Sequence, residues 1–210
     1  NMEWPMTRSE RPDADIAASA NLRLRLFTVT KRRSSEIKTD LDYARHGWVL
    51  AAPETVRSFS AVGYYFGRDL VASLDGVPVG LIHTSWGGSP AEVWMRLGVL
   101  EEDLEYRTQI VAKSDENRAK WEAAVAAWER RKADAAAKGE SFSEGRPGQP
   151  WQAGELYAGM LANIIPYGIR GAIWYQGESN AGRAWEYRRL FADMIRNWRQ
   201  DWGQRRFPFY

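Results

Sequence analysis

Apolar positions along the chain follow two different periods. The run LRLRLFTVT at 22–30 alternates apolar and polar residues, which is typical of a half-exposed β-strand. The runs at Val79–Thr84 (VGLIHT) and Ile169–Tyr175 (IRGAIWY) are short and mostly apolar, as in buried strands. Longer runs with apolar residues every three or four positions separate and follow these strands. This order predicts an α/β fold with a parallel sheet and crossover helices.

The three- to four-residue period predicts several helices. One extends from Val56 to Leu74 and ends at Asp75-Gly76. Its expected apolar face consists of Val56, Phe59, Val62, Phe66, Leu70 and Leu74. Ser89, with Pro90 next to it and Glu92 three residues on, forms a capping box that predicts another helix start. Further helices are expected over 153–165, where Pro166 ends the run, and over 183–200, and residues 207–210 resemble the beginning of a strand.

The region from residue 101 to residue 150 differs in character from the rest. Residues 116–138 are rich in Ala, Glu, Lys and Arg, and their larger apolar residues form one narrow stripe made of Trp121, Val125 and Trp128. The segment that follows, GESFSEGRPGQP at 139–150, is polar and turn-forming. We therefore expect one domain over 1–210 that carries a helical surface insertion at 101–150. A coiled-coil partner site is a sharper alternative, but the heptads are few.

Composition narrows the class of protein. With 210 residues, 44% of them hydrophobic, the chain is long enough for one domain with a core. A net charge of +2 gives no general field that would attract nucleic acid or a membrane surface, and no apolar run is long enough for a membrane helix. The absence of Cys excludes thiolate catalysis and disulfides, and two histidines, His46 and His83, make a transition-metal site improbable. Eleven tryptophans fit both packed cores and sugar-stacking surfaces.

Two polar loops follow strands that should end at the same edge of the sheet. These are SWGGSP at 85–90 and QGESN at 176–180. Ligands of open parallel sheets bind beyond the carboxyl ends of the strands. Backbone N–H groups at the Gly87-Gly88 turn, with the side-chain amides of Gln176 or Asn180, would stabilise the oxyanion of a tetrahedral intermediate. The plainer interpretation is that both loops only cap helices, with Ser179 or Asn180 as the second cap.

The nucleophile candidates within the chain are weak. The string GGSPA at 87–91 lacks the last glycine of a nucleophile elbow, and its Ser89 is expected to cap a helix. Ser85 and Ser179 flank the same loops without an evident base. His83 lies inside an apolar strand and is expected to be a hydrogen-bonded core histidine, and His46 is expected at the surface. The residues therefore indicate an oxyanion pocket without a convincing catalytic triad.

Five stretches of the chain closely resemble the sialate O-acetylesterase family, which are carbohydrate esterases of the SGNH hydrolase superfamily. The resemblance covers most of the chain outside the insertion, and its last two blocks are the most specific. The stretches are NMEWPM at 1–6, an interrupted NLRLF at 21–27, PETVRSFSAVGYYFGRDL at 53–70, GLIHTSWGGSPAEVW at 80–94 and IWYQGESNAGRAWEYRRLFADMIRNWRQDWG at 173–203.

This resemblance implies a three-layer αβα fold with a parallel, flavodoxin-like sheet. In the family the nucleophile is the serine of a Gly-Gln-Ser-Asn-Met-Glu string. Here Asn1-Met2-Glu3 matches its second half, so the serine is expected immediately before Asn1. The family's base histidine comes from an Asp-x-x-His motif near the C-terminal end, which is expected beyond Tyr210. The chain is therefore expected to be a catalytic-domain fragment, truncated at both ends and inactive by itself.

The resemblance also implies roles for residues that are present. Gly88 would donate its backbone N–H to the oxyanion and Gln176 its side-chain amide. Gly87 and Asn180 are the alternative donors, because the alignment of the blocks leaves a few residues of latitude. Glu178 would order its loop by accepting backbone hydrogen bonds. No metal or organic cofactor is implied.

The implied reaction is serine acyl transfer that releases acetate from an O-acetylated sugar. Trp4, Trp86 and Trp94 would bind the substrate by stacking on sugar rings, with core packing as the alternative for Trp94. Another class of function is a glycan-binding module that has lost catalysis and kept the cleft. The full-length protein is expected to be exported, and neither the particular sugar nor the oligomeric state follows from the sequence.

Overall fold

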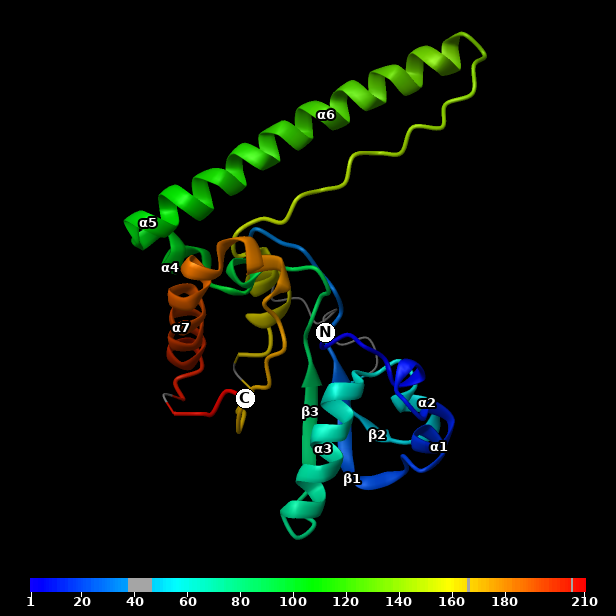
Figure 1. Ribbon diagram of the computed structural model, residues 1–210, viewed down its shortest axis with the longest axis vertical. Coiled ribbons are helices and arrows are strands. Elements are labelled where there is room, and N and C mark those ends of the chain that lie inside the picture. The colour runs from blue at the N-terminus through cyan, green and yellow to red at the C-terminus, as the bar shows by residue number, and fades with distance from the viewer. Residues whose placement is uncertain (38–46, 166, 205) are drawn as a thin grey trace.

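The computed structural model describes residues 1–37, 47–165, 167–204 and 206–210, so the predicted surface position of His46 lies outside the described residues. Within these ranges the chain forms a small sheet, several short helices and two long helices, α6 and α7 (Figure 1). In chain order the elements are η1 (Met6–Arg8), α1 (Pro12–Ala17), β1 (Asn21–Thr28), β2 (Val49–Ala51), α2 (Pro53–Val56), α3 (Ala61–Ser73), β3 (Val79–His83), η3 (Ala91–Trp94), α4 (Leu97–Glu102), α5 (Leu104–Tyr106), η4 (Arg107–Val111), α6 (Ala112–Ala137), η5 (Tyr157–Leu161), η6 (Glu178–Arg183) and α7 (Ala184–Asp201).

The sheet of the described residues has the order β2-β1-β3 and is mixed. β1 and β3 are parallel, in register from Leu24 opposite Val79 to Thr28 opposite His83, as the sequence predicts. β2 pairs with β1 antiparallel, so the prediction of an entirely parallel sheet is wrong at this edge. Residues 169–175 do not form a full strand. Ala172 makes a parallel bridge to Phe209, and its backbone N–H donates to the carbonyl of Pro208 over 2.9 Å.

The side chains of β1 contribute to two different hydrophobic cores, one on each face of the sheet. Leu24 and Leu26 belong to a core that includes residues of α1, α2 and α3. Phe27, with Val29 just beyond the strand, belongs to a larger core that includes residues of η3, η5 and α7. Side chains of a strand point alternately to opposite faces, so the central strand is covered on both faces.

The predicted helix over 56–74 is interrupted. α2 ends at Val56, and α3 begins at Ala61, where the hydroxyl of Ser60 accepts a hydrogen bond from the N–H of Gly63 over 3.0 Å. The buried face also differs from the predicted one, because Phe66 and Leu74 are 36% and 43% exposed. Gly67 lies against the sheet instead: a Cβ built there would be 2.6 Å from the Cδ1 of Leu81. Close approach at a glycine thus decides which face α3 buries.

The predicted capping box at Ser89 is wrong. The helix that follows is a short 3-10 turn, η3, with Pro90 at its N-cap position and no side-chain cap. The hydroxyl of Ser89 donates to the carbonyl of Trp86 over 2.6 Å and accepts from the indole N–H of Trp94 over 2.9 Å. Because the Ser89 hydroxyl makes these two hydrogen bonds, it does not cap η3.

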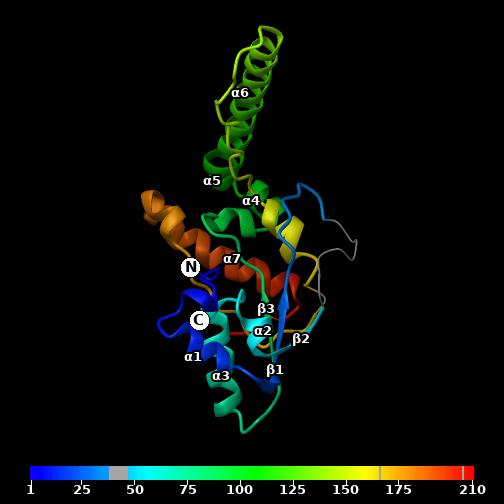
Figure 2. The ribbon, with the colours of Figure 1, turned by 90° about the vertical axis from the view of Figure 1, so that its right-hand side faces the viewer.

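The long helix of the 101–150 region forms as predicted. α6 and its return segment extend away from the rest of the molecule in two perpendicular views (Figures 1 and 2). The tryptophan stripe faces the return segment: the indole of Trp121 donates to the carbonyl of Pro147 over 3.1 Å, and that of Trp128 to the carbonyl of Glu144 over 2.8 Å. We call this pair of segments, residues 112–150, the arm.

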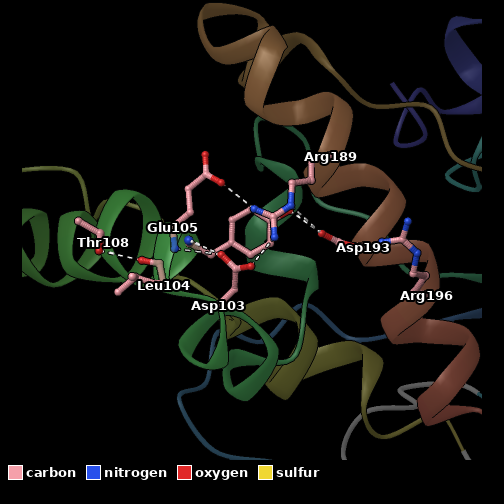
Figure 3. A network of polar contacts seen from close by, with 8 residues as sticks. Asp103, Leu104, Glu105, Thr108, Arg189, Asp193 and Arg196 are labelled. Carbon is pink, nitrogen blue, oxygen red and sulfur yellow. Dashed lines mark hydrogen bonds and ion pairs between the residues drawn. The ribbon is translucent and has the colours of Figure 1, made fainter.

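Ionic contacts hold α5, which precedes the arm, against α7 (Figure 3). The guanidinium of Arg189 contacts the carboxylates of Asp103, Glu105 and Asp193 and lies over the ring of Tyr106 at 4.6 Å. The Tyr106 hydroxyl donates to Asp193 over 2.7 Å, and burial raises the pKa of Tyr106. Asp103 caps α5 by accepting from the N–H groups of Glu105 and Tyr106 at 3.0 Å each. The Tyr106 N–H, together with Arg189, lowers the pKa of Asp103.

The two C-terminal helices differ in how well the sequence predicts them. α7 spans Ala184–Asp201 and buries Leu190, Met194 and Trp198, which confirms the predicted helix and its apolar face. The helix predicted over 153–165 is shorter: the helical backbone spans residues 155–161, of which 157–161 form the π turn η5. Gly159 of η5 lies against the backbone of residue 32, since a Cβ at Gly159 would be 2.1 Å from the carbonyl oxygen of Arg32.

Gly159→Ala should destabilise the chain by about 1–3 kcal/mol, because the added methyl meets a backbone carbonyl that cannot rotate away. Urea denaturation measures this change. Gly145→Ala is the matched control, since a Cβ at Gly145 meets nothing within 4 Å and the change should stay within about 0.5 kcal/mol. Equal midpoints for the two variants would contradict the close approach.

Arg189→Ala should raise the hydrogen-exchange rates of the Glu105 and Tyr106 amides, because the Asp103 carboxylate that accepts from them loses its cation. Added sodium chloride should act in the same direction in the wild-type chain, since these charges are partly exposed and screened by salt. Arg188→Ala, at the neighbouring exposed position, should leave both rates unchanged. Unchanged rates in Arg189→Ala would show that Asp103 holds α5 without this arginine.

Candidate functional site

The first glycine loop follows directly after β3. Gly88 has a φ of 77°, a left-handed conformation that favours glycine and that makes the tight turn. The N–H of Gly87 donates to a carboxylate oxygen of Glu3 over 2.5 Å, and the other oxygen of Glu3 pairs with Lys31 at 2.5 Å. Burial raises the pKa of Glu3, but the hydrogen bonds from Lys31 and Gly87 outweigh it, and the pKa lies below its ordinary value. The backbone at this turn therefore already binds an anionic oxygen.

The second loop is joined to the first by side-chain amides. The amide nitrogen of Gln176 donates to the carbonyl of Ser89 over 3.2 Å and to the amide oxygen of Asn180 over 2.7 Å. That oxygen also accepts from the backbone N–H of Ala91 over 2.9 Å. The structure thus brings together the two loops that the sequence predicts to meet. In this arrangement both N–H bonds of the Gln176 amide have acceptors.

A buried carboxylate fixes the far side of this junction. Glu92 is 8% exposed and accepts from the amide nitrogen of Asn180 over 2.9 Å. Its other oxygen accepts from the guanidinium of Arg183, which also pairs with Glu186 over 2.8 Å. Asn180 is itself 2% exposed. Asn180 therefore connects both loops to a charged pair beneath them.

The first residues of the chain lie at the same junction. The side-chain amide of Asn1 donates to the carboxylate of Glu178 over 2.5 Å, while Glu3 contacts Gly87 as described above. The N mark lies beyond the arrowhead of β3 in Figure 1. A backbone N–H of its own residue and the Asn1 amide lower the pKa of Glu178. The chain start, the 85–90 loop and the 176–180 loop are thus neighbours.

The structure also gives Ser85 a partner that sequence reasoning missed. The Nε2 atom of His83 lies 2.6 Å from the hydroxyl oxygen of Ser85, a contact that the sequence analysis did not identify. Residues i and i+2 of an extended chain point to the same side, and that spacing could have revealed the pair. Burial lowers the pKa of His83, which favours the neutral form of the ring. Among the described residues, no carboxylate hydrogen-bonds to its Nδ1 to orient the ring.

The three tryptophans expected to stack on sugars have different surroundings. Trp4 is 52% exposed, with its indole N–H on the carbonyl of Arg8 at 2.6 Å. Trp86 is half-buried, with Lys31 over its ring at 5.2 Å. Trp94 is 3% exposed and belongs to the core, so the core-packing alternative holds for this residue. Trp4 therefore keeps the most open ring of the three.

The described residues contain no group of three or more His, Cys, Asp or Glu side chains arranged to hold a metal ion. None of the helices in the described ranges is both long and apolar enough to cross a membrane.

Comparisons with known proteins agree with the resemblance seen in the sequence. The profile of a family described as "Carbohydrate esterase, sialic acid-specific acetylesterase" matches residues 135–210. The sialate O-acetylesterase of Mus musculus is 27% identical over 223 residues, which cover 100% of this chain and 40% of the mouse protein. That of Rattus norvegicus is 29% identical, over 93% of this chain and 37% of the rat protein.

A solved structure is also similar over the whole chain. The crystal structure of a carbohydrate acetylesterase from Xanthomonas citri superposes with a TM-score of 0.72 at 31% sequence identity. The superposition covers 100% of this chain and 38% of the Xanthomonas protein. The chain thus spans about 40% of the length of the relatives that it matches. On its sequence and its fold together, this chain is similar to members of the sialate O-acetylesterase family of carbohydrate esterases.

Proposed function

We propose that this chain is part of an enzyme that removes acetyl groups from O-acetylated sugars. The observation that carries the proposal is the meeting of three segments far apart in sequence: Asn1–Glu3, the Gly87-Gly88 turn and the loop of Gln176 and Asn180. Glycine N–H groups at the rim of a sheet are suited to an anionic oxygen. The relatives' printed names supply the substrate class, an acetylated carbohydrate.

In the proposed mechanism the nucleophile is the serine that the resemblance places before Asn1. A residue joined to Asn1 would lie beside the glycine turn, because Glu3 and Asn1 already contact the two loops. The serine oxygen bonds to the acetyl carbon while its proton passes to a histidine of the whole protein. The same proton goes to the departing sugar oxygen, and water then releases acetate. The sheet of the whole protein would be completed to the three-layer fold.

The glycine turn and the amides take different parts in this proposal. Gly88, with Gly87 as its neighbour, would donate backbone N–H groups to the oxyanion, and Glu3 would give up the N–H that it now holds. Gln176 would keep the two loops together, since its amide bridges Ser89 and Asn180. An amide so fixed costs no reorganisation when charge develops nearby.

In the serine-containing whole protein, Gln176→Ala should lower kcat by up to about 100-fold, the cost of losing one oxyanion donor, because the amide that joins the 176–180 loop to the glycine turn is lost. Hydrolysis of an acetylated sugar followed by acetate release measures it. Gln200→Ala, at an exposed position of α7, is the control and should keep the wild-type kcat. An unchanged kcat in Gln176→Ala would remove this residue from the site.

The 210-residue chain by itself should not hydrolyse p-nitrophenyl acetate above a heat-killed control. Its Ser85–His83 pair has hydrogen-bond geometry but lacks a carboxylate on Nδ1 among the described residues, and loss of that partner typically costs about 10⁴-fold. Turnover that disappears in Ser85→Ala would instead make this pair the nucleophile and base. Turnover in the whole protein that survives loss of the serine before Asn1 would have the same meaning.

A further inference from the structure

A cleft with a mixed polar and apolar lining lies away from the two glycine loops, where the arm joins the rest of the molecule. This cleft has a volume of about 440 Å³ and lies between the first turns of α6, the segment 149–155 and residues 33–35. Sites for small ligands typically have volumes of about 300–1,000 Å³. The size of the cleft therefore suits a ligand of several sugar units better than an ion.

One helix face builds a wall of the cleft. Val111, Ser114, Asp115 and Arg118 all line it, and their spacing of three, four and seven residues puts them on the same side of the helix. Three of these four side chains are polar. The two ends of the arm thus frame the cleft, with α6 on one side and residues 149–155 on the other.

The polar groups of the opposite wall are already held in place. The guanidinium of Arg33 pairs with Glu155, which is 4% exposed, over 2.7 Å, and it donates to the carbonyl of Gln149 over 3.3 Å. The hydroxyl of Ser114 donates to the side-chain oxygen of Gln152 over 3.1 Å. Groups fixed in this way lose little conformational entropy when a ligand binds.

The charges of the cleft disfavour an anionic ligand. Arg33 is paired with Glu155, and Arg118 with Asp115 at 2.8 Å, so both guanidinium groups are neutralised within the chain. Glu101 adds a further carboxylate to the lining. A ligand carboxylate would therefore meet a surface that is neutral to negative, whereas hydroxyl groups find both donors and acceptors.

A pair of tryptophans connects the cleft with the glycine loop. Arg33 lies over the ring of Trp151 at 4.8 Å, and Trp151 meets Trp86 edge to face at 5.4 Å. Trp86 is next to Gly87 in the sequence. The cleft and the candidate acyl-transfer site are thus the two ends of one continuous set of contacts.

We infer that the cleft at the base of the arm binds a neutral oligosaccharide, so that the acetylated substrate is a chain of uncharged sugars rather than a single acidic sugar. The choice of a sugar as the ligand rests on the proposed function. The polarity, charge and volume of the cleft set the class of sugar.

The test uses the 210-residue chain and unacetylated sugars, so that binding is measured independently of hydrolysis. The probes are β-1,4-linked hexasaccharides of xylose, glucose and mannose, and a sialylated trisaccharide as the acidic comparison, each titrated by calorimetry. Asp115→Trp places a bulky ring at the cleft, at a side chain that is 56% exposed and so tolerates the change. Asn117→Trp introduces the same ring on the opposite side of α6, and circular dichroism verifies that both variants fold.

At least one neutral hexasaccharide should bind saturably, and Asp115→Trp should weaken that binding about tenfold or more, or roughly 1.4 kcal/mol. Asn117→Trp should change it less than about twofold. Binding that Asp115→Trp leaves unchanged, no saturable binding of any neutral hexasaccharide, or tighter binding of the sialylated probe would each overturn the inference. Failure of the whole protein to release acetate from sugars would refute the proposed function and leave the binding result standing.

Discussion

The carboxylate of Glu92 is buried, and a buried charge is stable only with partners that replace water. Arg183 supplies the opposite charge, and Asn180 supplies a hydrogen bond. Because Asn180 is held there, its amide oxygen is fixed where Gln176 and the backbone of Ala91 can donate to it. The position of the 176–180 loop against the glycine turn therefore follows from the solvation of one carboxylate.

Much of the architecture can be predicted from the spacing of apolar residues along the chain. The strands β1 and β3 and the helices α6 and α7 follow from local pattern. The meeting of the two glycine loops was predicted from the rule that parallel strands end at one edge, and it occurs although residues 169–175 form only an isolated bridge. The capping box at Ser89 failed because a local hydrogen bond competes with tertiary ones. The indole of Trp94 and the carbonyl of Trp86 occupy the serine hydroxyl, and Asn180 and Arg183 occupy Glu92.

Close packing explains where the apolar pattern misleads. Phe66 and Leu74 have the right spacing for a buried stripe on α3, yet Gly67 is the residue that faces Leu24 and Leu81. Because glycine has no side chain, the spacing of apolar residues cannot predict that a helix packs against the sheet through a glycine. The Ser85–His83 pair was missed for another reason: a spacing of two residues is informative only once the backbone is known to be extended.

The π turn at the base of the arm sets the phase of the long helix. A π turn carries one more residue than an α-helical turn, and each residue of an α-helix turns the following ones by about 100°. Because the π turn accommodates this extra residue within one turn, deleting one residue between Arg107 and Val111 would restore an α-helical turn and leave Ser114 and Asp115 facing the cleft, whereas an α-helical segment of the same length would turn them by about 100°. The conformation of a five-residue segment thus determines which stripe of a 26-residue helix faces the cleft.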